Sequence, residues 1–158
     1  MSEARLSLYD WAQAEARVMP LRIEVFVCEQ GVPADMELDE FDPVSLHVVC
    51  ESDGHVIGTG RLLPDGHIGR LAVARDWRGQ GVGGRMLEAL LAEAARRGLD
   101  EAVLHAQVQA EAFYLRHAFM PDGPVFEEAG IPHRLMRRRL SPSQAATRGP
   151  FASDSQVR

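Results

Sequence analysis

The sequence predicts an α+β domain built on a mixed sheet, and three observations lead to this fold class. Three runs rich in β-branched residues are separated by the turn signals Asp53-Gly54 and Pro64-Asp65-Gly66, which predicts an antiparallel meander. A glycine-rich loop is followed by an amphipathic helix and a short apolar run, which predicts a parallel β-α-β unit with a right-handed crossover. Two strand-like runs lie near the C-terminus. The strands expected from these patterns are residues 45–52, 55–64, 67–73, 102–107, 121–127 and 133–140.

The segment before the meander is expected to contain a strand, a helix and a loop. Residues 5–9 have the pattern of a short strand, and residues 12–29 that of a helix. Residues 31–43 contain prolines, a glycine and acids, which predicts a loop or a broken short helix. The apolar residues that recur on one face of the helix are Val18, Leu21, Val25 and Cys28.

The helix after the glycine-rich loop has the clearest pattern in the chain. Arg96 and Arg97 suit the negative C-terminal end of this helix, and Gly98 can adopt the left-handed conformation that ends it. A shorter helix is expected at residues 108–117. The apolar face of the longer helix consists of Val82, Met86, Leu87, Leu90, Leu91 and Ala94.

Length and composition restrict the class of protein. A chain of 158 residues with 46% hydrophobic content is expected to form one domain, over residues 1–140. Residues 141–158 are small, polar and aperiodic, which predicts a disordered tail. No apolar run approaches the roughly 20 residues that a membrane helix needs, so we expect a cytoplasmic protein without a membrane partner. The net charge of −6 argues against a nucleic-acid partner.

The arginines and cysteines of the chain argue against several classes of reaction and binding site. All 17 basic residues are arginine, so the chain offers no lysine for a P-loop or for a Schiff base. Cys28 and Cys50 are expected to be buried thiols rather than a disulfide or a metal site. We therefore expect no metal cofactor.

The glycine-rich loop, residues 78–84 (RGQGVGG), is expected to bind phosphate. Backbone N–H groups at a helix N-terminus bind anions, and glycine lets a phosphate approach the backbone closely. The loop fits both the dinucleotide pattern G-x-G-x-x-G and the pattern R-x-x-G-x-G. Residues 74–78 separate the loop from the preceding strand, and the acids Asp100 and Glu101 precede the next strand rather than end it. Both facts disfavour the dinucleotide interpretation.

The surrounding run LAVARDWRGQGVGGRMLEALL, residues 71–91, resembles motif A of the GNAT acyltransferases, whose R/Q-x-x-G-x-G/A loop binds the pyrophosphate of acetyl-CoA. The order of the expected elements over residues 5–140 is similar to the order in that fold. Residues 26–42 (FVCEQGVPADMELDEFD) and 126–133 (FEEAGIPH) resemble the ElaA-like branch of the superfamily. The resemblance implies a GNAT fold, with acetyl-CoA as the acyl donor.

The resemblance also implies which residues contact the donor. The backbone of Leu71, Ala72 and Val73 would bind the pantetheine arm between two parallel strands that splay apart, and the Leu71 amide would polarise the thioester carbonyl. Gln107, another expected contact, stands where many family members have asparagine. The residues that would enclose the pyrophosphate are Arg78, Gly79, Gln80, Gly81, Val82, Gly83 and Gly84.

The run FYLRHAF, residues 113–119, matches the family pattern FY-x-x-x-GF, in which the tyrosine commonly protonates the leaving thiolate. Tyr114 is therefore expected to be catalytic rather than only a core aromatic residue. Ala118 replaces the usual glycine of this pattern, which predicts about 1 kcal/mol of strain if the left-handed backbone is kept.

Acyl transfer to an amine needs a base, because only the unprotonated amine attacks. His105, near the end of its strand, is the first candidate. Seven acids and no basic residue lie between residues 23 and 42, and they form either a solvated surface or an attraction for a small cationic amine or polyamine. The residues expected on the acceptor side are Glu29, Glu37, Asp39 and His133.

The predicted function is an N-acetyltransferase that transfers an acetyl group from acetyl-CoA directly to a primary amine of a small molecule or peptide, in a ternary complex. A non-catalytic coenzyme A-binding sensor or interaction module and a nicotinamide-dependent enzyme are the alternatives. The expected partner is a small-molecule amine, and a homodimer remains open.

Overall fold

The computed structural model of the chain describes residues 4–140, and the predicted disordered tail at residues 141–158 lies outside them. An eight-stranded sheet has the order β1-β2-β3-β4-β5-β8-β6, with β7 paired to β8. The strands are β1 (Arg5–Tyr9), β2 (Leu46–Ser52), β3 (His55–Leu62), β4 (His67–Val73), β5 (Glu101–Gln107), β6 (Met120–Pro121), β7 (Phe126–Glu128) and β8 (Ile131–Arg139).

The sheet confirms the predicted α+β class, with an antiparallel meander and a parallel β-α-β unit. Strands β1 to β4 pair as antiparallel neighbours, as short turns between β2, β3 and β4 require. The long helix α3 (Val82–Arg96) then carries the chain across the sheet, so that β5 runs parallel to β4. Strand β8 returns antiparallel to β5.

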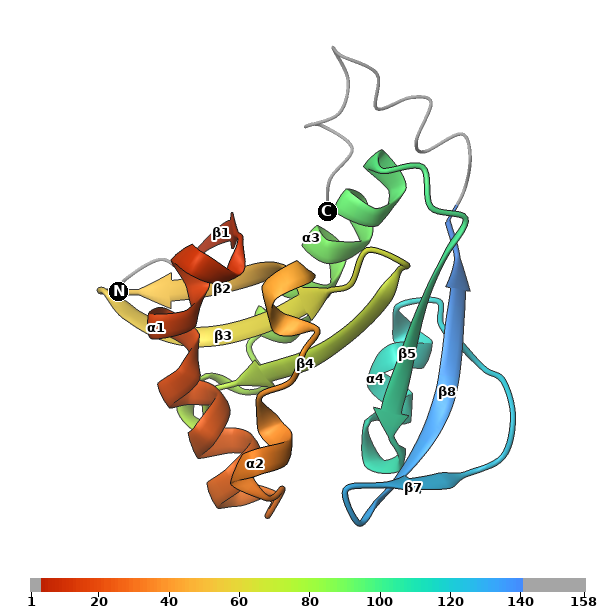
Figure 1. Cartoon of the computed structure of the whole chain (residues 1–158). Helices are drawn as coiled ribbons and strands as arrows, with labels where there is room; N and C mark the ends of the chain where they lie inside the picture. Colours follow the sequence, from red (N-terminus) through yellow and green to blue (C-terminus); the bar gives the residue numbers. More distant parts are fainter. Residues whose placement is uncertain (1–3, 141–158) are drawn as a thin grey trace.

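Helices cover both faces of the sheet (Figure 1). On β2, Val49 packs against α1 (Trp11–Arg22), whereas its neighbours Val48 and Cys50 belong to the core beneath α3. Since successive strand residues point to opposite faces, α1 and α3 cover opposite faces. None of the helices within residues 4–140 combines the length and apolar character needed to cross a membrane. The buried face of α3 is the predicted one, with Ala95 added: Val82, Met86, Leu87, Leu90, Leu91, Ala94 and Ala95.

The predicted helix at residues 12–29 changes its helical type part-way. A capping box starts α1, because Gln13 N–H donates to Asp10 Oδ1 at 2.9 Å and Asp10 N–H donates to Gln13 Oε1 at 3.4 Å. The chain continues as a π-helix, η1 (Ile23–Glu29). The wider turn of a π-helix changes which residues face the sheet. The prediction that Cys28 is buried was accordingly wrong, since Cys28 is exposed, whereas Cys50 is buried.

The segments around the predicted site also contain short elements. The expected broken helix at residues 31–43 consists of α2 (Ala34–Glu37) and a 3-10 turn, η2 (Asp42–Val44). The expected helix at 108–117 begins as a 3-10 turn, η4 (Val108–Ala110), and ends as α4 (Glu111–Arg116). The C-terminal part contains three strands instead of the two predicted, because the expected strand at 121–127 is divided into β6 and β7, which pair separately with β8.

Strands β4 and β5 pair only where they begin. Their register contains His67 opposite Val103 and Ile68 opposite Leu104. Beyond these pairs the two strands diverge, as Figure 1 shows. The predicted splay of the parallel strands is therefore confirmed, and it leaves strand backbone without a strand partner on both sides of the gap.

Candidate active site

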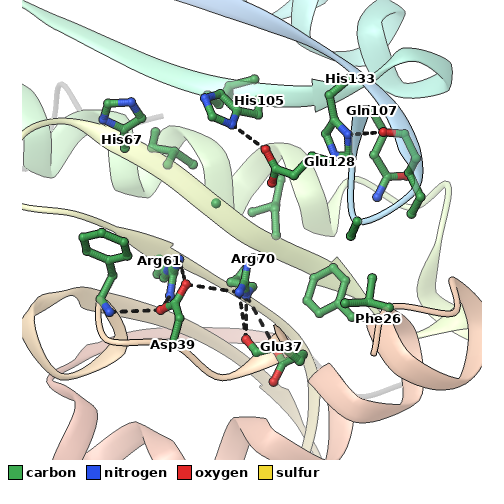
Figure 2. A pocket seen from close by; sticks show the side chains of 18 of the residues that line it. Phe26, Glu37, Asp39, Arg61, His67, Arg70, His105, Gln107, Glu128 and His133 are labelled. Carbon is green, nitrogen blue, oxygen red and sulfur yellow. Dashed lines mark hydrogen bonds and ion pairs between the residues drawn. The ribbon is translucent and has the colours of Figure 1, made fainter. Parts of the chain in front are cut away.

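A cavity of about 630 Å³ occupies the region where β4 and β5 separate. Its walls come from β4, β5, α2, the end of η1, the start of α4 and the turn between β7 and β8 (Figure 2). The predicted site residues that line it are Leu71, His105, Gln107, Tyr114, Glu37, Asp39 and His133. Ala72, Val73 and the loop at residues 78–84 follow at the C-terminal end of β4, outside the cavity lining.

Strand β4 bulges beside the cavity. The register with β3 advances two residues from Thr59 to Arg61, but three residues from Ala72 back to Gly69. The additional residue bends the strand and changes the direction of its polar groups. Arg70, within the bulge, has a φ of 50°, a left-handed conformation that costs about 1–3 kcal/mol for a residue with a side chain.

The backbone beyond the bulge faces the gap. Ala74 N–H donates to Ile57 O of β3 at 2.8 Å. Because the backbone polar groups alternate along a strand, Ala72 points to β3 in the same way, and Val73 and Leu71 point away from it. The carbonyl of Val73 accordingly accepts a hydrogen bond from outside the sheet, from Arg78 Nε at 2.8 Å.

The guanidinium of Arg70 joins this bulge to α2. Nε and Nη2 donate to the carbonyl oxygen of Glu37 at 3.0 and 2.8 Å. Nη2 also donates to Met36 O and to Asp39 Oδ2, both at 3.2 Å. Figure 2 shows these contacts at one wall of the cavity. The four hydrogen bonds offset the cost of the left-handed backbone at Arg70.

Arg70 belongs to a larger group that we name the arginine–acid cluster, which consists of Arg22, Arg61, Arg70, Glu37, Asp39 and Asp42. Arg22 is only 1% exposed, and it binds Asp42 through two hydrogen bonds of 2.9 and 3.1 Å and Glu37 through a third. Arg61 donates to Asp39 at 2.7 and 2.9 Å and to Asp42 at 2.8 Å.

The cluster balances its own charge. Burial alone would raise the pKa of Asp42. The hydrogen bonds and charges of Arg22 and Arg61 lower it by more than burial raises it, so the pKa of Asp42 lies below its ordinary value. Burial also acts to raise the pKa of Asp39, but the hydrogen bonds and charge of Arg61 outweigh it, so this pKa is lowered as well. Asp39 thus lines the cavity as an ionised carboxylate, and both Glu37 and Asp39 are already paired with arginines. The sequence pattern hid this compensation, because the arginines come from outside residues 23–42.

The loop before α3 has the geometry of an anion site. Gly79 and Gly81 have φ values of 77° and 88°, and Gly81 caps the helix without a side chain. The first hydrogen bond of the helix runs from Arg85 N–H to Gly81 O at 3.0 Å. The N–H groups of residues 82–84 precede this bond and have no acceptor within the helix. They are therefore available to an anion at the positive end of the helix.

Arg78 connects this loop to the π-helix. Besides its bond to Val73 O, it donates from Nη2 to Glu29 Oε1 at 2.7 Å, and Arg75 lies 3.5 Å from the same carboxylate. The hydrogen bond from Arg78 lowers the pKa of Glu29. Glu29 therefore lies at the glycine-rich loop, and the structure does not bring it to the expected acceptor residues with which the sequence grouped it.

Helix α4 packs closely against the start of α3. A Cβ on Gly84 would lie 3.1 Å from His117 Nε2, and one on Gly83 would lie 3.6 Å from the Phe113 ring. His117 is itself held by Glu88, with 2.8 Å between Nδ1 and Oε2. Gly83 and Gly84 therefore allow α4, which carries Tyr114, to lie against the first turn of α3.

Tyr114 lies between the rings of Phe113 and Phe119, with centroid distances of 5.0 and 5.9 Å. Burial raises the pKa of Tyr114 to about 12, so the phenol keeps its proton at neutral pH. None of the residues between 4 and 140 forms a hydrogen bond with its hydroxyl group. Ala118, directly before Phe119, keeps the left-handed backbone on which the expected strain depends, with a φ of 66°.

Two histidines and one glutamine enter the cavity from β5 and β8 (Figure 2). His105 Nδ1 lies 2.8 Å from Glu128 Oε1, and His133 Nδ1 lies 2.7 Å from Ile131 O. Gln107 Nε2 donates to Gln30 Oε1 at 2.8 Å, so this side chain connects β5 to the end of η1. Within residues 4–140, no group of three or more His, Cys, Asp or Glu residues is arranged to hold a metal ion.

Comparison with known proteins decides the family. A model of the acetyltransferase (GNAT) domain matches residues 13–140. The chain belongs to the GNAT acetyltransferase family. Over 122 residues it is 39% identical to the uncharacterized N-acetyltransferase YjcF of Bacillus subtilis, and the match covers 75% of this chain and 87% of that protein.

Solved GNAT structures have the same fold. An acyl-CoA N-acyltransferase from Pseudomonas aeruginosa has a TM-score of 0.78 and 34% identity, with 86% of this chain and 99% of that chain covered. ElaA of Escherichia coli has a TM-score of 0.77 and 26% identity, with 85% and 99% covered. This GNAT chain is therefore an acyltransferase that uses an acyl-CoA as co-substrate.

The residues present fit coenzyme A as the carrier. The positive-φ glycines leave the first N–H groups of α3 open to a phosphate, and the gap exposes unpaired strand backbone to an amide-bearing arm. The dinucleotide interpretation of the loop is not needed for this GNAT protein.

The sequence analysis missed two residues beside the reacting region, Arg70 and Glu128. An arginine gives no sequence signal for a positive φ, and its partners lie more than 30 residues away in the chain. The position of Glu128 does have a local sequence signal, the turn-forming pair that follows it. The pair Ala129-Gly130 has φ values of 54° and 76°, as a two-residue hairpin turn requires, and this turn brings Glu128 back beside β5.

Proposed function

We propose that this GNAT enzyme transfers an acetyl group from acetyl-CoA directly to a primary amine of a small molecule or peptide, within a ternary complex. The observation that carries the proposal is the gap between β4 and β5, into which a protonated tyrosine and a histidine both face. Each supplies one of the two proton transfers that the reaction needs.

The donor would be held by the backbone of β4 that follows the bulge. The polar groups of Leu71 and Val73 face the gap, where they can pair with the amides of the pantetheine arm, and Ala72 keeps the strand attached to β3. The Leu71 N–H would stabilise the charge that develops on the thioester oxygen. The pyrophosphate would lie against the N–H groups of residues 79–84, with Arg78 fixing the loop and Gln107 bordering the arm.

His105 and Tyr114 then perform opposite proton transfers. His105 removes the proton from the acceptor ammonium, so that the free amine nitrogen can form a bond to the acetyl carbon. The carbon–sulfur bond breaks as the amide forms, and Tyr114 donates its proton to the departing thiolate. The raised pKa of Tyr114 ensures that the donor is protonated over the whole neutral range.

The acceptor site is proposed between α2 and the β7–β8 turn, with Glu37, Asp39 and His133 as walls. The arginine–acid cluster changes the expected substrate. Because arginines compensate Glu37 and Asp39, these acids give no reason to expect selection of a polyamine over a monoamine. Met36 and Phe41 line the same cavity and are 50% and 42% exposed, so they offer apolar contact to the rest of an amine.

Direct transfer needs no protein nucleophile. Burial raises the pKa of the Cys50 thiol, which disfavours the reactive thiolate. Cys28 is exposed on η1 and is not part of the cavity lining. Replacing both cysteines by serine should therefore leave turnover nearly unchanged, and loss of turnover with acetyl-CoA binding preserved would exclude direct transfer.

The test of the proposal is the Tyr114→Phe variant in a thiol-release assay. The panel of acceptors contains phenethylamine as a monoamine, putrescine as a diamine and a dipeptide with a free N-terminus. Loss of the proton donor should lower kcat by about 100-fold, at the low end of general-acid contributions, with the KM for acetyl-CoA little changed. A Tyr114→Phe variant with the wild-type kcat would exclude Tyr114 as the proton donor.

A further inference from the structure

We infer that Glu128 is a positioning residue for His105, which it holds in the one tautomer that can accept a proton from the acceptor amine. The inference rests on the proposed function, because it takes His105 as the base. It adds a residue that acts through the imidazole, without contact to either substrate.

The β7–β8 hairpin carries Glu128 to its place. Glu128 pairs with Ile131 across the two-residue turn, and β8 continues beside β5, with Leu135 opposite His105. The side chain of Glu128 then reaches across to the imidazole, with 2.8 Å between Oε1 and Nδ1. The Phe126 ring meets the edge of the same imidazole at a centroid distance of 5.2 Å. The imidazole is thus fixed by one polar and one aromatic contact from a single hairpin.

The contact determines which nitrogen carries the proton. An ionised carboxylate only accepts hydrogen bonds, so Nδ1 of His105 must be the protonated nitrogen. Nε2 of the neutral ring then has the free lone pair, which is what a general base needs. Once Nε2 takes a proton, the carboxylate of Glu128 also stabilises the imidazolium.

The register of the sheet places His105 at the start of the gap. The last strand pair is Ile68 with Leu104, so the next position would set Gly69 opposite His105. A Cβ on Gly69 would meet no atom within 4 Å, which leaves open space in front of the imidazole. Figure 2 shows His105 and Glu128 projecting into the cavity from the β5 side, opposite the arginine–acid cluster.

A second histidine–carboxylate pair nearby serves as a matched comparison. His67 Nδ1 lies 3.0 Å from Asp65 Oδ1, and its ring meets His105 edge-on at 6.1 Å. His67 belongs to the last paired positions of β4, before the strands separate. Among residues 4–140, the titratable groups in contact with the imidazole of His105 are therefore Glu128 and His67, and His67 in turn contacts Asp65. The two carboxylates have the same chemistry, but Glu128 contacts His105 directly, whereas Asp65 is separated from it by the ring of His67.

The experiment compares Glu128→Gln with Asp65→Asn, using the most active amine of the panel. Glu128→Gln should lower kcat at least 10-fold with an unchanged KM for acetyl-CoA, because the amide can donate to Nδ1 and reverse the tautomer. It should also move the acidic limb of the pH–rate profile to lower pH, since the imidazolium loses a stabilising charge. Asp65→Asn should leave both the kcat and the profile unchanged, and Glu128→Asp should restore part of the kcat.

A fourth variant, His105→Gln, separates this inference from the function on which it rests. Thermal unfolding first verifies that each variant is folded and is stabilised by acetyl-CoA. If His105→Gln loses turnover while Glu128→Gln keeps the wild-type kcat and profile, the role of Glu128 is refuted and the base assignment stands. Wild-type turnover in His105→Gln would refute both the base assignment of His105 and the role of Glu128. Equal effects of Glu128→Gln and Asp65→Asn would mean a general electrostatic effect and would also overturn the inference.

Discussion

Arg70 donates from Nη2 to Asp39 Oδ2 at 3.2 Å while its own backbone holds the left-handed turn of the β4 bulge, with a φ of 50°. One residue thus connects α2 and Asp39, the proposed acceptor wall, to the strand that would bind the donor. The buried partners of Asp39 extend this connection, because Arg61 binds it as well. The hydrogen bonds of Arg70 to α2 therefore tie the position of this helix to the backbone beside Leu71.

The first prediction concerns this connection. Arg70→Gly accepts the left-handed backbone but removes the guanidinium, and Arg70→Lys keeps the charge but not the forked hydrogen bonds. Both should lower kcat by about 10- to 100-fold, because small misplacements of reacting groups cost factors of this size. Steady-state kinetics on variants shown to be folded by circular dichroism measures the effect. A folded Arg70→Gly variant with the wild-type kcat would show that the hydrogen bonds of the Arg70 guanidinium are not needed to position the bulge.

The second prediction separates the phosphate-binding loop from general helix stability. Gly81 and Gly98 flank α3 with φ values of 88° and 80°, and a Cβ on either would meet no atom within 4 Å. Alanine at either site should therefore cost about 1–2 kcal/mol through backbone strain alone. Only Gly81→Ala should also raise the KM for acetyl-CoA several-fold. A similar KM increase in Gly98→Ala would attribute the effect to stability rather than to the loop.

The third prediction concerns the strained alanine after α4. Ala118 occupies the left-handed region at a φ of 66°, where glycine carries no steric penalty. Ala118→Gly should stabilise the protein by about 1 kcal/mol, which corresponds to a Tm increase of about 2–4 °C for a chain of this size. Differential scanning calorimetry measures the shift. An unchanged or lower Tm would show that the gain is cancelled by the greater freedom of glycine in the unfolded chain.

The fourth prediction concerns stability at acidic pH. The folded-state pKa of Asp42 is lowered below its ordinary value of 3.8, so the unfolded chain binds the proton more readily. The stability from this group is fully present above pH 3.8 and is lost as the pH falls through the lowered folded-state pKa. Asp42→Asn should flatten this acid dependence. It should also destabilise the protein by about 3–5 kcal/mol at neutral pH, because it leaves Arg22 and Arg61 with an uncompensated buried charge.

Denaturant unfolding at several pH values tests this account of the arginine–acid cluster. Glu40, which lies in the same acidic segment and is exposed, provides the control. Glu40→Gln should leave both the stability and its acid dependence unchanged. If the two variants had equal effects, the net charge of the segment rather than the buried pairing would explain the acid dependence.

The antiparallel meander, the long helix and the glycine-rich turn before it could be predicted because each depends on local pattern. Alternating and helical periodicities and the glycines at 79 and 81 all act within a few residues. The expectation for Ala118 rested instead on the resemblance to the pattern FY-x-x-x-GF, in which glycine usually stands at this position, and the structure keeps the left-handed backbone there.

The electrostatics of the site could not be predicted in the same way. The acids of residues 23–42 look unpaired in sequence, yet Arg22, Arg61 and Arg70 reach them from α1, β3 and β4. Glu29 was grouped with the acceptor residues because it is near them in the chain, but the π-helix places it beside Arg78. Pairings of this kind depend on tertiary contacts between segments far apart in the sequence.

Amine-dependent release of coenzyme A from acetyl-CoA by the wild-type protein tests the central proposal most directly. Thiol release is followed with and without phenethylamine, putrescine and the dipeptide, and the acetylated product is identified by mass spectrometry. The proposal predicts thiol release that requires an amine and matches the acetylated amine mole for mole. Acetyl-CoA binding, seen as thermal stabilisation, without release above the amine-free rate for any of these acceptors would contradict it.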